Sequence, residues 1–256
     1  MKSLTTKNCN EKTKLILLAL GAALMFPAGV SAQDKFTVSG NLDLVANYVW
    51  RCMDQNSGVS VQPGLGLAYK GFSLSAWGSQ SLTNNADRDV QEFDINLGYS
   101  IGGFSATITD YWWGGLHNPY GYYKNGPADN PVDGGHHFEA TVAYRVSDKV
   151  PLTVSWSTWF AGADLRTSGD KRCYSTYISV SYDIACPAEI TLTPSVGFTP
   201  WEGYYHDKAA FIDISLKASR DIALSSKFSL PLFVQVIASP VNNHVYLVAG
   251  IGIGLF

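Results

Sequence analysis

The sequence lacks three features that would each point to a familiar class of protein. Beyond residue 32 it has no apolar run near the roughly 18 residues expected of a membrane-spanning helix, so a helical membrane protein is excluded. It has no basic cluster, so nothing indicates a nucleic-acid partner. Its four cysteines form no Cys-x-x-Cys pair and no Cys/His group with metal-ligand spacing, so we expect neither a metal nor a cofactor.

The N-terminus has the pattern of a bacterial secretory signal peptide. Four lysines precede an apolar run of about a dozen residues, and a small-x-small cleavage pattern after the run ends at Ala32. The run is too short for a spanning helix, which needs about 20 residues. We therefore expect residues 1–32 to be a cleaved signal peptide and residues 33–256 to be a single mature domain. Its 14 basic and 20 acidic side chains give a formal charge of −6.

After residue 35 the chain repeats one pattern about a dozen times: roughly ten residues of alternating polarity, then a turn. Residues 36–44 show it, with apolar side chains at most even positions and polar ones at most odd positions. Successive strand side chains point to opposite faces, so each strand has an apolar and a polar face. Many such strands behind a signal peptide favour an all-β fold, a single antiparallel transmembrane β-barrel, over a soluble sandwich.

The alternation predicts twelve strands. They are 36–51, 58–69, 72–82, 90–101, 104–113, 136–146, 151–161, 173–184, 189–200, 209–219, 228–238 and 244–256. Short connections alternate with mostly longer ones along the chain, as expected for short periplasmic turns and longer outer loops. The longest connection, 114–135, is expected to be either a surface lid or an inward constriction.

Aromatic side chains near the strand ends predict two girdles at the membrane interfaces. They are Tyr48, Trp50, Tyr69, Phe72, Tyr99, Phe104, Tyr144, Phe160, Tyr182 and Phe198. Three prolines, Pro63, Pro194 and Pro231, lie inside predicted strands, where each requires a bulge or a local break. Continuing the alternation from Phe104 places Asp110 on the lipid side, so a bulge is expected directly after it.

The same alternation along each strand predicts which charged side chains face the lumen. The candidate pore-lining residues are Asp43, Arg51, Glu92, Asp94, Glu139, Arg145, Asp183, Asp213 and Lys217. Their net charge of −3 would favour cations or weakly charged solutes if the lumen conducts. A plugged interior, in which these charges pair with one another, is an equal alternative. A disulfide between Cys52 and Cys173 is possible, because both lie at the outer end of the predicted barrel.

The first predicted hairpin resembles the TorF-type porin family. That family pattern runs aromatic-x-x-Arg-Gly, then a Gln, then a second Gln that opens a strand. This sequence matches it at Tyr48, Arg51, Gln55 and Gln62, and departs from it at Cys52. The resemblance implies a small outer-membrane porin-like barrel of unassigned substrate, over about 20 residues of the chain.

A second resemblance lies at the C-terminus. Phe256 resembles the terminal residue of the assembly signal of bacterial outer-membrane barrels, which implies the barrel-assembly machinery as a partner. The expected function is that of a porin-like channel for passive diffusion of small polar or cationic solutes across the bacterial outer membrane, in contact with outer-membrane lipid.

Two other functions remain open at this point. One is a non-conducting structural or adhesive barrel. The other, weaker one is a hydrolase that uses a rim histidine as general base, because His137 and Glu139 share one strand face. No nucleophile motif accompanies these residues, so we expect the protein not to be an enzyme.

Overall fold

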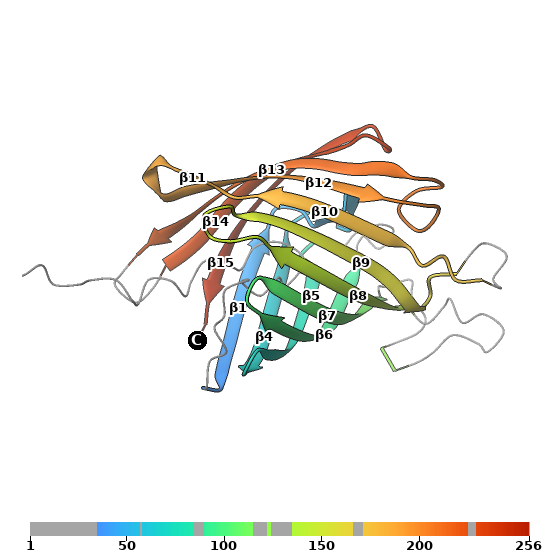
Figure 1. Ribbon diagram of the computed structural model, residues 1–256. Coiled ribbons are helices and arrows are strands. Elements are labelled where there is room, and N and C mark those ends of the chain that lie inside the picture. Colours follow the sequence, from blue (N-terminus) through green and yellow to red (C-terminus); the bar gives the residue numbers. More distant parts are fainter. Residues whose placement is uncertain are drawn as a thin grey trace, which may run out of the picture.

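The protein is a closed antiparallel β-barrel in the computed structural model, which describes residues 35–56, 58–83, 90–114, 122–123, 135–165, 171–224 and 229–255 (Figure 1). The predicted signal peptide and Phe256 lie outside these residues. So does most of the connection 114–135, and its expected role as lid or constriction stays a prediction. No helix among the described residues is long and apolar enough to cross a membrane.

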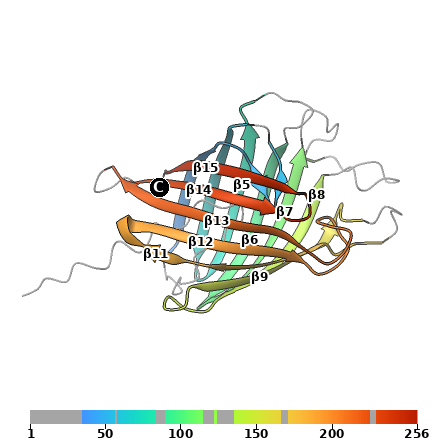
Figure 2. The ribbon, with the colours of Figure 1, turned by 90° about the horizontal axis from the view of Figure 1, so that it is seen from above.

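One sheet of antiparallel neighbours forms the wall. It contains β1 (Thr37–Val45), β4 (Ser60–Tyr69), β5 (Phe72–Ser81), β6 (Gln91–Ile101), β7 (Phe104–Gly114), β8 (His136–Arg145), β9 (Leu152–Gly162), β10 (Thr176–Tyr182), β11 (Ile184–Cys186), β12 (Ile190–Thr199), β13 (Ala210–Ala223), β14 (Ser229–Ser239) and β15 (His244–Gly254). β1 pairs with β15, and β10 pairs with β12, so the sheet closes on itself. Figure 2 shows β12, β13, β14 and β15 side by side in this wall.

β10 and β11 form one interrupted strand, because both pair with β12 on either side of Asp183. Counted in this way, the barrel has twelve strands, which confirms the predicted number and fold class. The short connections 70–71, 102–103, 146–151, 187–189 and 224–228 alternate along the chain with 46–59, 82–90, 115–135, 163–175, 200–209 and 240–243. Antiparallel strands therefore gather the two sets at opposite ends of the barrel, also as predicted.

The two faces of the wall differ in polarity as the alternation predicts. On the hairpin of β4 and β5, the large apolar side chains of Leu65, Leu67 and Leu74 are exposed on the outside. Ser73 and Ser75, on either side of Leu74 in the chain, are buried inside. Cross-strand hydrogen bonds between buried hydroxyls and amides line the interior. Examples are Thr109 Oγ1 to Asn96 Oδ1 at 2.7 Å and Ser195 Oγ to Ser215 Oγ at 2.7 Å.

Each internal proline coincides with a gap in the ladder on one side. Pro63 pairs with Leu42 of β1, but the pairing of β4 with β5 skips from Val61 to Gly64. Pro194 lies opposite the interruption between β10 and β11. Pro231 pairs with β13, while the pairing of β14 with β15 starts one residue later. The expected local breaks are confirmed, because a proline has no N–H to donate.

The bulge expected beside Asp110 is wrong. β7 pairs with β6 and β8 in continuous register, so Asp110 stays on the outer face of the wall. There its Oδ1 lies 2.8 Å from Nδ1 of His136, and the histidine Nε2 lies 2.8 Å from the Tyr122 carbonyl oxygen. A carboxylate that is hydrogen-bonded near the end of a strand removes the need for a bulge. Register shifts occur instead between Phe138 and Glu139 and between Gly197 and Phe198.

The first strand is shorter than predicted. The sequence predicts a strand over 36–51, but β1 ends at Val45. The chain then forms a separate hairpin of β2 (Val49–Trp50) and β3 (Met53–Asp54), which pair only with each other. Trp50 and Cys52 of this hairpin are buried, Asp54 is exposed, and the buried side of the hairpin forms the centre of the candidate site.

Candidate functional site

The β2–β3 hairpin turns through two residues with positive φ. Trp50 pairs with Met53, and the two central residues, Arg51 and Cys52, have φ values of 44° and 64°. Two positive values at these positions are typical of a type I′ turn, where glycine is favoured at the second of them.

Polar contacts hold both sides of this hairpin. The Gln55 amide donates to the Tyr48 carbonyl oxygen at 2.8 Å. The buried Asn56 side chain donates to Ser60 Oγ at 3.0 Å and accepts from the Val90 amide at 2.9 Å. The hairpin base is therefore tied to β4 and to the start of β6.

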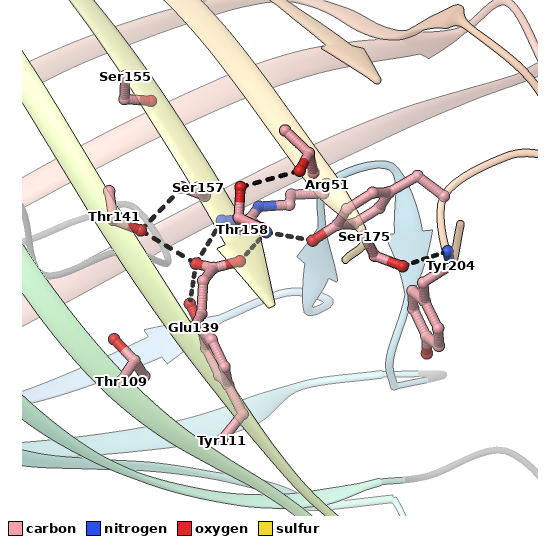
Figure 3. A network of polar contacts seen from close by, with 12 residues as sticks. Arg51, Thr109, Tyr111, Glu139, Thr141, Ser155, Ser157, Thr158, Ser175 and Tyr204 are labelled. Carbon is pink, nitrogen blue, oxygen red and sulfur yellow. Dashed lines mark hydrogen bonds and ion pairs between the residues drawn. The ribbon is translucent and has the colours of Figure 1, made fainter. Parts of the chain in front are cut away.

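Arg51 and Glu139 form the main polar contact between the hairpin and the wall (Figure 3). Nη1 and Nη2 of Arg51 donate to the two carboxylate oxygens of Glu139 at 2.5 and 2.8 Å. The side chains are 10% and 1% exposed, so the pair is almost fully removed from solvent. Tyr111 and Thr141 each donate to Oε1 of the same carboxylate at 3.2 Å. Burial of a charge is unfavourable unless the charge is paired and hydrogen-bonded. Here the two groups neutralise each other, and the two hydroxyl donors add further hydrogen bonds to the carboxylate.

Aromatic rings surround the guanidinium. Its carbon lies 4.6 Å from the ring centres of Trp50 and Tyr177 and 5.5 Å from that of Tyr205. Nη1 also donates to the Tyr205 hydroxyl. Burial alone would lower the pKa of Arg51, but Glu139 outweighs burial and the pKa lies well above its usual value. Arg51 is therefore a fixed positive charge inside the barrel.

Trp50 is the centre of an aromatic cluster that crosses the lumen. Its ring lies 5.4–6.1 Å from those of Tyr111, Trp113, Trp159 and Tyr205. These rings come from β7, from β9 and from the connection 200–209, and Trp159 is fully buried. The hairpin therefore links opposite sides of the barrel and narrows its interior.

Two girdle assignments are wrong for this reason. Tyr48 and Trp50 are buried inside the barrel, because the chain leaves the wall at Val45. Arg51 points into the barrel from the hairpin rather than from a strand of the wall. Sequence parity missed Trp50, Tyr111 and Tyr205 as lumen residues. The resemblance around Arg51 was the one signal that marked this segment as unusual.

A second group of charges lies on β6. Glu92 and Asp94 are both buried on the inner face, in register with Trp113 and Tyr111 of β7. Tyr48 of the hairpin base lies within hydrogen-bonding reach of Glu92, and its burial, followed by the charges of Glu92 and Asp94, raises its pKa well above the usual value. Among the described residues no ion pair joins either carboxylate to a base. These are two of the predicted lumen acids.

A third group lies near the end of the barrel that carries the short turns. Arg145 Nη1 donates to Asp183 Oδ2 at 2.8 Å, and Thr193 Oγ1 donates to Asp183 Oδ1 at 2.9 Å. Lys217 is close enough to Asp183 to be influenced by its charge. The structure therefore brings three of the predicted lumen residues together here.

The two remaining predicted acids have polar neighbours. Asp43 is buried on β1, where Asn41 donates to its Oδ2 at 2.8 Å. Asp213 is buried on β13 and accepts from the Tyr177 hydroxyl at 2.7 Å. All nine predicted residues thus lie on the inner side of the barrel, in separate groups. Whether solutes pass along them is taken up below.

The histidine–carboxylate pair that the weaker hydrolase alternative would require is not assembled. No hydrogen bond joins His137 to Glu139 in the part of the chain that the structure describes. His137 packs against Trp113 and Trp159, with ring centres 4.8 and 4.4 Å apart, while Glu139 binds Arg51. The described residues also contain no group of three or more His, Cys, Asp or Glu that could hold a metal ion.

The possible Cys52–Cys173 disulfide is not formed. Cys52 is carried inward on the hairpin turn, where its thiol lies within hydrogen-bonding reach of Ser239 and burial raises its pKa. Cys173 remains in the connection between β9 and β10, with its amide donating to the Asp164 carbonyl oxygen. The inward turn of the hairpin therefore separates the two cysteines.

The chain is similar to one protein family and to several solved structures. The model of a family described as "Bacterial protein of unknown function (Gcw_chp)" matches residues 30–246, whereas no curated protein matches the sequence. The matched model does not support the TorF-type assignment.

Among solved structures, a KdgM porin has a TM-score of 0.48 at 10% identity, covering 84% of this chain and 97% of that one. A KdgM porin in complex with disordered oligogalacturonate has a TM-score of 0.43 at 9% identity, covering 85% and 96%. A Salmonella typhi OmpF complex with daunomycin has a TM-score of 0.38 at 9% identity, covering 87% and 98%. The family model covers most of the chain, and the chain therefore belongs to the family of bacterial proteins of unknown function named Gcw_chp.

Proposed function

We propose that the protein is an outer-membrane porin-like channel for the passive diffusion of small polar or cationic solutes. The observation that carries this proposal is a closed barrel with an apolar outer face and an inner face lined by charged and hydroxyl side chains. A closed antiparallel barrel satisfies all backbone groups within the wall, and its outer apolar band matches lipid. A polar interior then provides the path for solutes.

The inner charges support a preference for cations. Six acids and three bases face the interior among the residues predicted to line it. Arg51 neutralises Glu139, and Arg145 neutralises Asp183. Glu92 and Asp94 have no such ion pair among the described residues. A lumen with excess negative charge lowers the energy of a cation inside it and raises that of an anion.

The β2–β3 hairpin supports a narrow or intermittently open channel rather than a wide one. Trp50 lies against rings from β7, β9 and the connection 200–209, so side chains narrow the lumen at its level. Conduction then requires the hairpin or the connection 200–209 to move. We expect small solutes to pass and large ones to be excluded.

Reconstitution of the purified protein in planar bilayers tests the proposal. We expect stepwise conductance, with a reversal potential in a potassium chloride gradient that indicates cation preference. A variant in which residues 47–55 are replaced by a short glycine linker should show larger and more frequent steps. Flat current from both proteins at several times the resting potential would instead indicate the non-conducting structural barrel.

We also propose delivery by the barrel-assembly machinery through the C-terminal segment, which consists of β15 and the residues after it up to Phe256. β15 pairs with β1 to close the barrel, so the last strand is needed for closure. Removal of Phe256 should reduce the amount of folded protein in the outer membrane. An unchanged amount in cell fractionation would exclude this role of the last residue.

A further inference from the structure

The cage around the Arg51 guanidinium is built mainly by the barrel wall. Glu139 and Thr141 lie on β8, Tyr111 on β7 and Tyr177 on β10. The hairpin itself supplies only the guanidinium and the ring of Trp50. If the hairpin moves away, the carboxylate, its two hydroxyl donors and the Tyr177 ring stay in the wall.

We propose that this wall cage is a binding site for guanidinium-bearing solutes, and that Arg51 occupies it as a tethered competitor while the hairpin lies in the lumen. The proposal rests on the proposed function and names a solute class for it. Binding of such a solute to Glu139 would stabilise the state in which the hairpin is displaced. A ligand shifts an equilibrium in this way when it binds one state better than the other.

The geometry selects a planar, multiply donating cation. Both Glu139 oxygens accept from Arg51 at once, which is the fork-to-fork geometry of a guanidinium with a carboxylate. The Tyr177 ring centre lies 4.6 Å from the guanidinium carbon, close enough for a cation–π contact. A quaternary ammonium ion has no N–H to donate and would leave the buried carboxylate without hydrogen bonds from the ligand.

The cage is held in shape by groups outside the hairpin. The Tyr177 hydroxyl donates to Asp213 at 2.7 Å, which fixes the orientation of the ring. Gly197 lies against this contact, and a Cβ there would collide with the Tyr177 hydroxyl and the Asp213 carboxylate. Tyr111 and Thr141 hold Glu139 by donating to its Oε1. The site is therefore expected to persist without Arg51.

Hydrogen bonds to Ser60 and Val90 tie the base of the hairpin to the wall, whereas its tip is held to the wall through side chains. Its two short strands pair with each other and not with the wall sheet. Its turn holds two non-glycine residues at positive φ, a strained conformation that persists only where the surroundings enforce it. The Arg51–Glu139 pair is the contact that enforces it most directly.

The proposal is tested by removing the Arg51 side chain and supplying free guanidinium in its place. Arg51→Ala should leave the cage empty, and millimolar guanidinium chloride should then raise the heat-denaturation midpoint and change the bilayer conductance in a saturable manner. Arg51→Ala/Glu139→Gln lacks the carboxylate charge and should bind guanidinium about tenfold more weakly. Tetramethylammonium chloride at the same concentration controls for ionic strength and should produce neither response.

The outcomes separate this proposal from the channel function. Equal guanidinium responses in the single and double variants would overturn the guanidinium site. If guanidinium stabilises Arg51→Ala but neither the wild type nor any variant conducts, the binding site is supported and the channel function is excluded. If Arg51→Ala folds poorly, its refolding yield into detergent with guanidinium against tetramethylammonium gives the same comparison, and equal yields would overturn the proposal.

Discussion

Arg51 occupies a backbone conformation that arginine rarely adopts, and its side chain explains why. A positive φ brings Cβ close to the backbone, a strain that glycine avoids. The buried bidentate pair with Glu139 and the stacked rings offset this strain, because they form only when the turn points inward. Cys52, next to it, carries a second positive φ without a comparable contact, and this is the position where the resembling pattern has glycine.

Loss of the Glu139 charge should destabilise the barrel more than loss of the Asp183 charge. Glu139→Gln leaves the nearly buried Arg51 guanidinium without a counter-charge, a change that costs about 3 kcal/mol. Asp183→Asn removes a carboxylate that is 37% exposed, where a pair contributes less than about 1 kcal/mol. Urea unfolding in detergent, followed by the folded-to-unfolded shift on a gel, measures both. Similar midpoints for the two variants would contradict the prediction.

At the scale of elements, the barrel wall and the β2–β3 hairpin behave as separate structures. The wall strands form one hydrogen-bonded sheet around the barrel. Local gaps in the pairing occur beside the prolines, which have no amide N–H. The hairpin has a two-residue ladder of its own and contacts the wall through side chains. Side-chain contacts can be broken without unfolding the wall, so the hairpin is the element that we expect to move.

A disulfide between the hairpin and β14 should reduce channel opening. The native Cys52 thiol lies within hydrogen-bonding reach of the Ser239 hydroxyl, so Ser239→Cys places two thiols close together. Oxidation should then lower the open probability in bilayers, and a reductant should restore it. Cys52→Ala/Ser239→Cys is the matched control and should not respond. An open probability that is independent of oxidation, after the bond is confirmed by mass spectrometry, would show that the hairpin is not the moving part.

At the scale of the whole molecule, closure joins parts of the chain that are distant in sequence. β1 meets β15, and β10 meets β12 across the break at Asp183. This closure places acids from β1, β6, β8 and β13 around one interior. The electrostatic field in that interior depends on all of them together, so selectivity belongs to the molecule rather than to any one strand.

Neutralisation of the β6 carboxylates should reduce cation preference. Glu92→Gln/Asp94→Asn removes two acids that have no ion pair among the described residues, whereas Asp110→Asn removes an acid on the outer face. We expect the reversal potential in a potassium chloride gradient to move toward zero for the first variant and to stay near the wild-type value for the second. Equal shifts would mean that the two carboxylates do not face the conducting path.

Heating should reveal the closed barrel directly. A closed sheet has no free edge from which to unfold, so unheated protein should keep its compact form in detergent and migrate faster on a gel than heated protein. Removal of β15 takes away the partner of β1 and should abolish the difference. A full-length protein that migrates identically before and after heating would contradict closure.

The sequence predicted the wall well and the interior poorly. Strand positions followed from alternation and turns, and the breaks at Pro63, Pro194 and Pro231 followed from proline chemistry. The bulge after Asp110 was wrong, because His136 on the neighbouring strand pairs with that carboxylate. The alternation predicted that the charged strand residues lie on the inner face. It did not predict which of them come together, because it assigns a side chain to a face of the sheet and says nothing about its neighbours on other strands.

By itself, the sequence determined the barrel: a period of two assigns each side chain to a face, and this local rule needs no knowledge of distant residues. The tertiary structure alone decided the direction of the chain after Val45. Apolar and aromatic side chains at 48–53 suit a lipid girdle and a packed lumen equally. The choice depends on Arg51 meeting Glu139, 88 residues away, and on rings from β7, β9 and the connection 200–209. Those partners share one interior only after the barrel has closed.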